Sequence, residues 1–249
     1  MRCIYCGTLA QPLTDEHIIP FGLGGRLILP KASCNKCADV TSGPERYCQK
    51  VLFGEERVHL GLPSRRKSKQ PTSFAVGVNY DGHHRKRTLK IPDHPFVMQS
   101  FTVDSPGIFR GAALDGPVTG FRVWIANVQL DIADRIRRLG VNEIETERLI
   151  KPHLFLQMLA KIAHSYTSAV LPDETYTPTL PPLIVGGRVE ECPYFVGGSD
   201  IPAESFSDGR SLHEIKLLPR RDGLVVVGIQ LFAMRSAPVY EVVSGQSKS

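Results

Sequence analysis

Two Cys-x-x-Cys pairs, Cys3–Cys6 and Cys34–Cys37, constrain the fold of this chain more than any other feature. Each pair can present two thiolates from a tight turn, and two such knuckles complete a tetrahedral zinc site. Gly7 follows the first pair and suits such a turn, because glycine tolerates a positive φ. A redox pair would be expected beside a thioredoxin-like βαβ pattern, which the sequence lacks; the remaining alternative is thiols that are simply buried. We therefore predict one structural zinc ion held by the four cysteines.

The composition is that of an ordinary globular protein. The chain has 249 residues, 42% hydrophobic and 22% charged, which is enough to bury a core in one or two domains. Its longest apolar stretch, residues 223–234, is shorter than the roughly 20 residues that a transmembrane helix needs. The N-terminal residues MRCIYCG lack the apolar segment of a secretion signal. The predicted location is therefore cytoplasmic, where thiols stay reduced and paired cysteines more often hold metal than each other.

The chain divides into three parts by its residue types. Residues 1–62 carry the cysteine pairs, residues 63–73 (PSRRKSKQPTS) have the composition of a basic linker, and residues 74–249 look like a separate α+β domain of unknown role. In the last part, strand-like runs cover 73–79, 87–91, 96–103, 121–128, 212–218, 224–234 and 239–243, and one helical block covers 143–170. Strands and helices that are segregated in this way predict an α+β fold.

The segment between the cysteine pairs carries the candidate chemistry. It reads Asp15-Glu16-His17-Ile18-Ile19-Pro20 and continues into a glycine-rich loop, residues 21–25. We expect short strands over 14–20 and 26–30, and then a helix over 41–60 whose first residue is capped by Thr41 or Ser42. An acidic residue and a histidine at the end of a strand, followed by this loop and a second cysteine pair, resemble the HNH endonuclease family over about residues 1–60.

The resemblance implies a ββα-metal fold, in which zinc pins two strands to a helix and a separate Mg²⁺ or Mn²⁺ lies between the first strand and the helix. It implies that His17 is the general base that activates water, and that Glu16 helps to hold the catalytic ion. Both roles agree with physical chemistry, because a neutral imidazole can accept a proton near pH 7 and a hard cation prefers carboxylate oxygen. For His17 the alternative is a hydrogen-bonded structural histidine.

Two positions depart from the family pattern. Arg26 stands where an asparagine is usual, and Ala38, which cannot ligate, stands where the second metal ligand is usual. Glu45 lies two helical turns after Ala38 on the same face and is our expected substitute, with Asp39 as the other candidate. For both carboxylates the alternative is that they favour the start of the helix through its dipole.

Residues 1–95 hold 15 Lys and Arg against 8 Asp and Glu, and nucleic acid is a natural partner for such an excess. We expect Arg26, Arg65, Arg66, Lys67 and Lys69 to contact phosphates; a second run, HHRKR at 83–87, is a further candidate. The alternative is a solvated linker and hairpin tip.

The sequence predicts a metal-dependent HNH-type endonuclease that hydrolyses DNA phosphodiester bonds. The alternative, favoured by Ala38, is a catalytically degenerate zinc-knuckle module that binds nucleic acid or a protein partner.

Overall fold

The computed structural model describes residues 2–9, 12–80, 83–127, 129, 131–140, 143–145, 150–219 and 222–248. It combines helices with small sheets, and the described strands all pair antiparallel, so the α+β class is confirmed. No helix among these residues is both long and apolar enough to span a bilayer.

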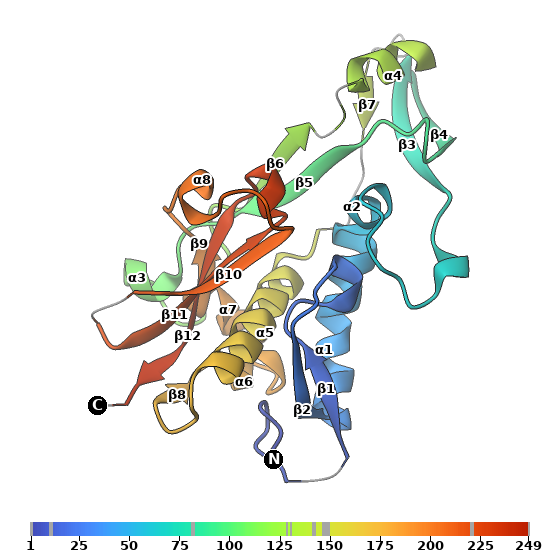
Figure 1. The fold of residues 1–249 in the computed structure, drawn as a ribbon. Helices are drawn as coiled ribbons and strands as arrows, with labels where there is room; N and C mark the ends of the chain where they lie inside the picture. Colours follow the sequence, from blue (N-terminus) through green and yellow to red (C-terminus); the bar gives the residue numbers. More distant parts are fainter. Residues whose placement is uncertain are drawn as a thin grey trace.

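The first strands form a two-stranded antiparallel sheet that leads directly into a helix (Figure 1). Strand β1 is Leu13–His17, β2 is Ile28–Cys34, and α1 is Asn35–Tyr47. The pairing register shifts between Thr14 and Glu16, and the Asp15 carboxylate accepts a hydrogen bond from the Lys31 amide at 3.0 Å. Such a bulge breaks the alternation of faces. As a result Leu13 and Glu16, which strict alternation would put on opposite faces, are both buried.

The predicted start of the helix, Thr41 or Ser42, is wrong. Helix α1 begins at Asn35, immediately after Cys34, because the second cysteine pair turns the chain from β2 straight into the helix. Pro44 therefore lies inside the helix, where its missing N–H removes one hydrogen bond. The predicted single helix over 41–60 is also interrupted: a π-helical turn, Cys48–Leu52, separates α1 from α2, Gly54–His59.

The remaining strands form three further sheets. The largest has the order β10-β11-β12-β8, and β9 also pairs with β12; the other two are β4-β3-β7 and β5-β6. The strands are β3 Ser73–Tyr80, β4 His83–Lys90, β5 Val97–Thr102, β6 Arg122–Asn127, β7 Glu143–Glu145, β8 Tyr176–Pro178, β9 Val196–Gly198, β10 His213–Leu218, β11 Leu224–Leu231 and β12 Val239–Ser247. Each predicted strand of residues 73–249 thus overlaps an observed one.

The predicted helix over 143–170 is correct only in its second part. Residues Glu143–Glu145 pair with β3 as β7, and α5 covers Pro152–Val170. Proline at the start of α5 suits the first helical turn, where its missing N–H costs nothing. The other helices are α3 Gly107–Arg110, α4 Ile132–Leu139, α6 Pro181–Ile184, α7 Cys192–Phe195 and α8 Ala203–Phe206, with 3₁₀ turns at Phe21–Leu23, Lys67–Lys69, Val189–Glu191 and Ala233–Arg235.

Helix α5 lies at the centre of the molecule. It packs against β11 and β12 on one side and against α1 on the other (Figure 1). One hydrophobic cluster includes Leu23 and Leu52 from the first 62 residues together with Phe155 and Val242. The core therefore joins the two ends of the sequence through α5. The division of the chain into two domains at residues 63–73 stays a prediction.

Candidate metal centre and the adjacent cleft

The four paired cysteines meet at one point. Their Sγ atoms all lie within 4.8 Å of one another, and Cys3, Cys34 and Cys37 are buried while Cys6 is exposed. Tetrahedral zinc with Zn–S bonds of about 2.3 Å separates its sulfur ligands by about 3.8 Å. The Cys6 and Cys34 sulfur atoms lie 3.8 Å apart. Among the described residues this is the only cluster of such donors, and it can hold a metal ion such as zinc.

Local backbone geometry supports a site for thiolates. Gly7 adopts φ +71°, as expected for the turn after the first pair, and its amide donates to the Cys3 carbonyl at 2.9 Å. The Cys34 amide donates to the Cys3 sulfur at 3.4 Å. Burial raises the pKa of the Cys3 thiol, but hydrogen bonds from backbone amides outweigh burial and lower that pKa to about 7. Amides that point at the sulfur favour the charged form that a metal ion binds.

A cleft of about 890 Å³ opens beside the β1–β2 pair and α1. His17, at the end of β1, lies on one wall. The same face of α1 contributes Ala38 and Glu45 to the lining, which agrees with their spacing of two turns. Partial burial, together with the charge of Arg65, lowers the pKa of the His17 imidazole below its usual value of 6.5. His17 is therefore neutral at pH 7, the form that accepts a proton.

The basic linker returns over this cleft. Arg65, Arg66 and Lys69 are exposed and line its other wall. The Arg65 guanidinium lies 5.9 Å from the centre of the Phe21 ring, and the Phe21 and His17 rings are 5.6 Å apart. Three of the four linker cations predicted to bind nucleic acid thus line the same cleft as the histidine. The side chain of the fourth, Lys67, lies outside the described residues.

Arg57 fixes the linker in this place. Its guanidinium donates to the carbonyls of Gly22 at 2.5 Å, Gln49 at 3.1 Å and Pro63 at 3.1 Å. These carbonyls belong to the turn after β1, to the π-helical turn and to the start of the linker. One half-buried cation therefore ties together three segments that line the cleft.

A buried lysine lies between the two glutamates that we expected to hold a catalytic ion. The Lys161 ammonium, from the middle of α5, forms ion pairs with Glu16 and, at 2.7 Å, with Glu45. It also donates to the backbone carbonyl of His17 and, at 3.4 Å, to that of Ile18. The Lys161 side chain is 2% exposed. Burial lowers the pKa of this ammonium, but the two carboxylates outweigh burial and raise it above 10.5.

The donor set around Glu16 and Glu45 does not fit a divalent ion in this arrangement. Mg²⁺ requires about six oxygen ligands at 2.0–2.1 Å. The space that two carboxylates would share around such an ion holds the Lys161 nitrogen instead, and Ala38 supplies no donor. Tyr5 lies beside this cluster. Burial and the negative charge of Glu16 raise the pKa of the Tyr5 hydroxyl, and that hydroxyl lies 3.0 Å from the Ser165 hydroxyl.

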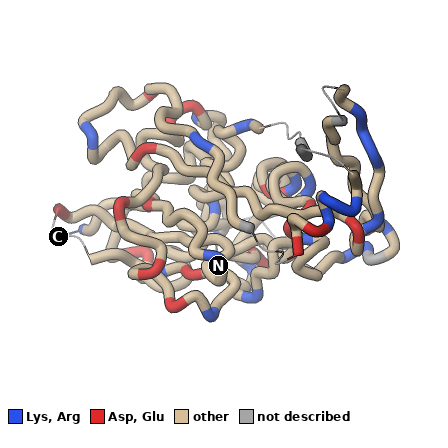
Figure 2. Tube along the Cα trace, turned by 90° about the horizontal axis from the view of Figure 1, so that it is seen from above, with Lys and Arg blue, Asp and Glu red and all other residues tan. Residues whose placement is uncertain are grey.

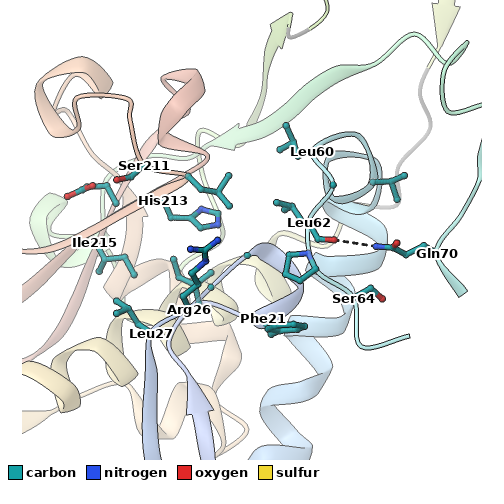
Figure 3. Close-up of a pocket in the computed structure, with 18 residues that line it drawn as sticks. Phe21, Arg26, Leu27, Leu60, Leu62, Ser64, Gln70, Ser211, His213 and Ile215 are labelled. Atoms are coloured by element: carbon teal, nitrogen blue, oxygen red, sulfur yellow. Dashed lines mark hydrogen bonds between the residues drawn. The ribbon is translucent and has the colours of Figure 1, made fainter. Parts of the chain in front are cut away.

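Arg26 does not reach the histidine cleft. It lies at a second cavity, of about 1130 Å³, between the glycine-rich loop and β10, where its side chain points toward His213 (Figure 3). Phe21 lines both spaces. The HHRKR run lies on β4, whose residues 83–87 are all exposed. None of these five residues lines the cleft that holds His17. Figure 2 marks the positions of Lys and Arg residues along the chain.

Two histidines outside the His17 cleft are packed against the backbone. His164 is buried and hydrogen-bonded to the Ile4 carbonyl at 2.8 Å, and burial lowers its pKa to about 4. His213 shares a hydrogen bond of 2.7 Å with the Leu23 carbonyl.

Comparisons with protein-family models, with curated proteins and with solved structures found no match to this chain.

Sequence reasoning missed Lys161. The signal was present, because this lysine falls in a helical segment whose neighbours Leu159, Ala160, Ile162 and Ala163 are apolar. A lysine in such a place is almost never fully buried unless it is paired. The expected partners were the two carboxylates already singled out.

Proposed function

We propose that residues 1–62 form an HNH-type ββα module, stabilised by zinc, that hydrolyses phosphodiester bonds of DNA. The observation that carries the proposal is the cleft itself, which a neutral imidazole shares with three exposed cations. His17 and the three exposed linker cations line one space large enough for a strand segment. A base opposite fixed positive charge is the arrangement that attack of water on a phosphodiester requires.

The chemistry follows from the positions of these groups. Arg65, Arg66 and Lys69 bind the phosphate oxygens and offset their charge. His17 accepts a proton from a water molecule, whose oxygen forms a bond to phosphorus. The bond from phosphorus to the leaving sugar oxygen breaks, and that oxygen takes a proton from solvent. The lowered pKa of His17 keeps its imidazole ready to accept the proton at neutral pH.

The second candidate is a zinc-knuckle module that binds nucleic acid or a protein without cleaving. Ala38 and the ion pairs of Lys161 favour it, because both depart from a site built around a catalytic ion. The cations of the cleft serve this function equally well.

A nicking assay on supercoiled plasmid separates the two functions. We expect His17→Ala to reduce cleavage by about 10²-fold or more, the usual scale for loss of a general base, while DNA binding is retained. His153→Ala is the matched control, because this exposed histidine lies at the start of α5. Cleavage that is unchanged in His17→Ala would refute the role of His17. Wild-type protein that binds DNA but never cuts it would leave the binding module.

A further inference from the structure

We propose that Lys161 occupies, as a built-in cation, the position between Glu16 and Glu45 where a divalent ion would otherwise bind, so that the cleft works without a catalytic metal ion. The consequence for catalysis rests on the proposed function. The claim that Lys161 excludes a metal ion from the site does not rest on the proposed function.

Every donor of the ammonium has an acceptor in the folded chain. An ammonium has three N–H donors and no acceptor. Four oxygen atoms surround it: one from each glutamate and the carbonyls of His17 and Ile18. Carboxylates and carbonyls are also the ligands that a hard cation selects. The pocket is therefore a cation site whose cation belongs to the chain itself.

A divalent ion and this ammonium cannot share the site. An ion about 2.1 Å from both carboxylates would overlap the Lys161 nitrogen, which already lies 2.7 Å from the Glu45 oxygen. The side chain has no nearby alternative, because it is held on a buried face of α5 and solvent reaches 2% of it. Expelling the ammonium would leave an unpaired charge in the core, which is strongly unfavourable.

Lys161 acts as a positioning residue rather than on substrate. It is absent from the residues that line the cleft, whereas Glu16, His17 and Glu45 are among them. Its hydrogen bond to the His17 carbonyl fixes the end of β1 that carries the imidazole, and its charge offsets two carboxylates that would repel phosphate. The positive charge that meets the phosphate then comes from the linker cations on the opposite wall.

The test uses Mn²⁺ alone as the probe, added to the zinc-loaded full chain and followed by electron paramagnetic resonance of the free ion. We expect no saturable Mn²⁺ binding to the wild-type protein. We expect Lys161→Ala to bind one Mn²⁺ per chain, because it leaves two carboxylates around an open space, and the added Glu16→Gln change to abolish that binding. Lys50→Ala is the control, because this exposed lysine lines the same cleft.

Two results would overturn the proposal. One is saturable Mn²⁺ binding to the wild type that Glu16→Gln removes; this measurement needs no Lys161 variant and holds even if Lys161→Ala fails to fold. The other is a folded Lys161→Ala protein that binds no Mn²⁺, because the lysine would then not be what excludes the ion.

Cleavage assays separate this proposal from the proposed function. We expect wild-type nicking to persist in a chelator at a concentration that leaves the zinc content, checked by elemental analysis, unchanged. If nicking requires added Mg²⁺ or Mn²⁺, the proposal of a built-in cation is wrong and the proposed nuclease function stands. If the wild type excludes Mn²⁺ as expected but cleaves under no condition, the nuclease function is wrong and the built-in cation stands.

Discussion

Replacement of Lys161 by methionine tests how the buried ion-pair cluster contributes to stability. Methionine has a similar length and no charge, so the change removes the ammonium with little loss of packing. Glu16, which is buried, and Glu45, whose side chain is 21% exposed, would then lose their shared partner. Removing one member of a buried ion pair costs about 3–5 kcal/mol, because a buried charge is left uncompensated.

The partial exposure of Glu45 places the expected cost near the lower end of this range. Water can rehydrate the Glu45 carboxylate better than the more buried Glu16 carboxylate, so we expect a loss of about 3 kcal/mol at pH 7. For a chain of this length, that corresponds to a decrease in Tm of about 6–12 °C. Urea unfolding of the zinc-loaded protein measures the loss directly. Lys151→Met, at an exposed position just before α5, is the control and should stay within about 0.5 kcal/mol of the wild type.

The dependence on pH gives a second check. The pKa of Lys161 is raised in the folded state, so its contribution is fully present below about pH 10.5 and is lost as the pH rises through the higher folded value. In Lys161→Met the buried carboxyl of Glu16 prefers its proton, so the difference from the wild type should shrink as the pH falls toward 4. Adding Glu16→Gln should recover part of the lost stability at pH 7. A loss below about 1 kcal/mol, or an additive double variant, would refute a buried charged cluster.

Three further outcomes are expected. Cys34→Ser should remove zinc, measured by elemental analysis at about one ion per chain in the wild type, whereas Cys192→Ser, buried elsewhere, should keep it; a wild type without zinc in reducing buffer would contradict the site. Arg65→Gln should reduce the slope of log affinity for duplex DNA against log salt by about 0.9. Arg210→Gln, on an exposed loop, should leave that slope unchanged. Equal slopes for both variants would show that Arg65 does not contact DNA phosphates. The imidazole of His17 should titrate by NMR with a midpoint below 6.5, and a midpoint above that value would show that burial and Arg65 do not act on it.

The cysteine cluster was readable from the sequence because its geometry is local. A Cys-x-x-Cys pair fixes two sulfur atoms through a single turn, and the meeting of Cys3 and Cys6 with Cys34 and Cys37 needs only that the chain between them returns. The positive φ of Gly7 followed from the same argument. The strands were also readable, since alternation and β-branched residues mark them.

The ends of the helices were not readable, because tertiary constraints overrode local signals. Thr41, Ser42 and Pro44 favour a helix start by their intrinsic chemistry. The helix nevertheless begins at Asn35, since Cys34 and Cys37 must present their sulfur atoms from the turn where β2 ends. Local preference and the geometry of the cluster compete here, and the cluster prevails at the cost of a proline in the helix interior.

The inward position of Glu16 was likewise hidden, because it depends on a bulge. Strict alternation along β1 would place Glu16 on the face opposite Leu13. The register shift at Asp15 brings both to the buried side. The residue types of β1 do not predict this shift, at which the Asp15 carboxylate accepts a hydrogen bond from the amide of Lys31, a residue with positive φ in the partner strand.

In the proposed module, Ala38 and Lys161 are consistent with each other. Around a divalent ion, an alanine at position 38 leaves the coordination shell short of a ligand. An ammonium needs only three hydrogen-bond acceptors, and Glu16, Glu45 and the His17 carbonyl supply them. A further ligand side chain at position 38 is therefore not needed. On the proposed assignment, the alanine after the second cysteine pair and the lysine in the middle of α5 both agree with a cation that is supplied by the chain instead of by a bound ion.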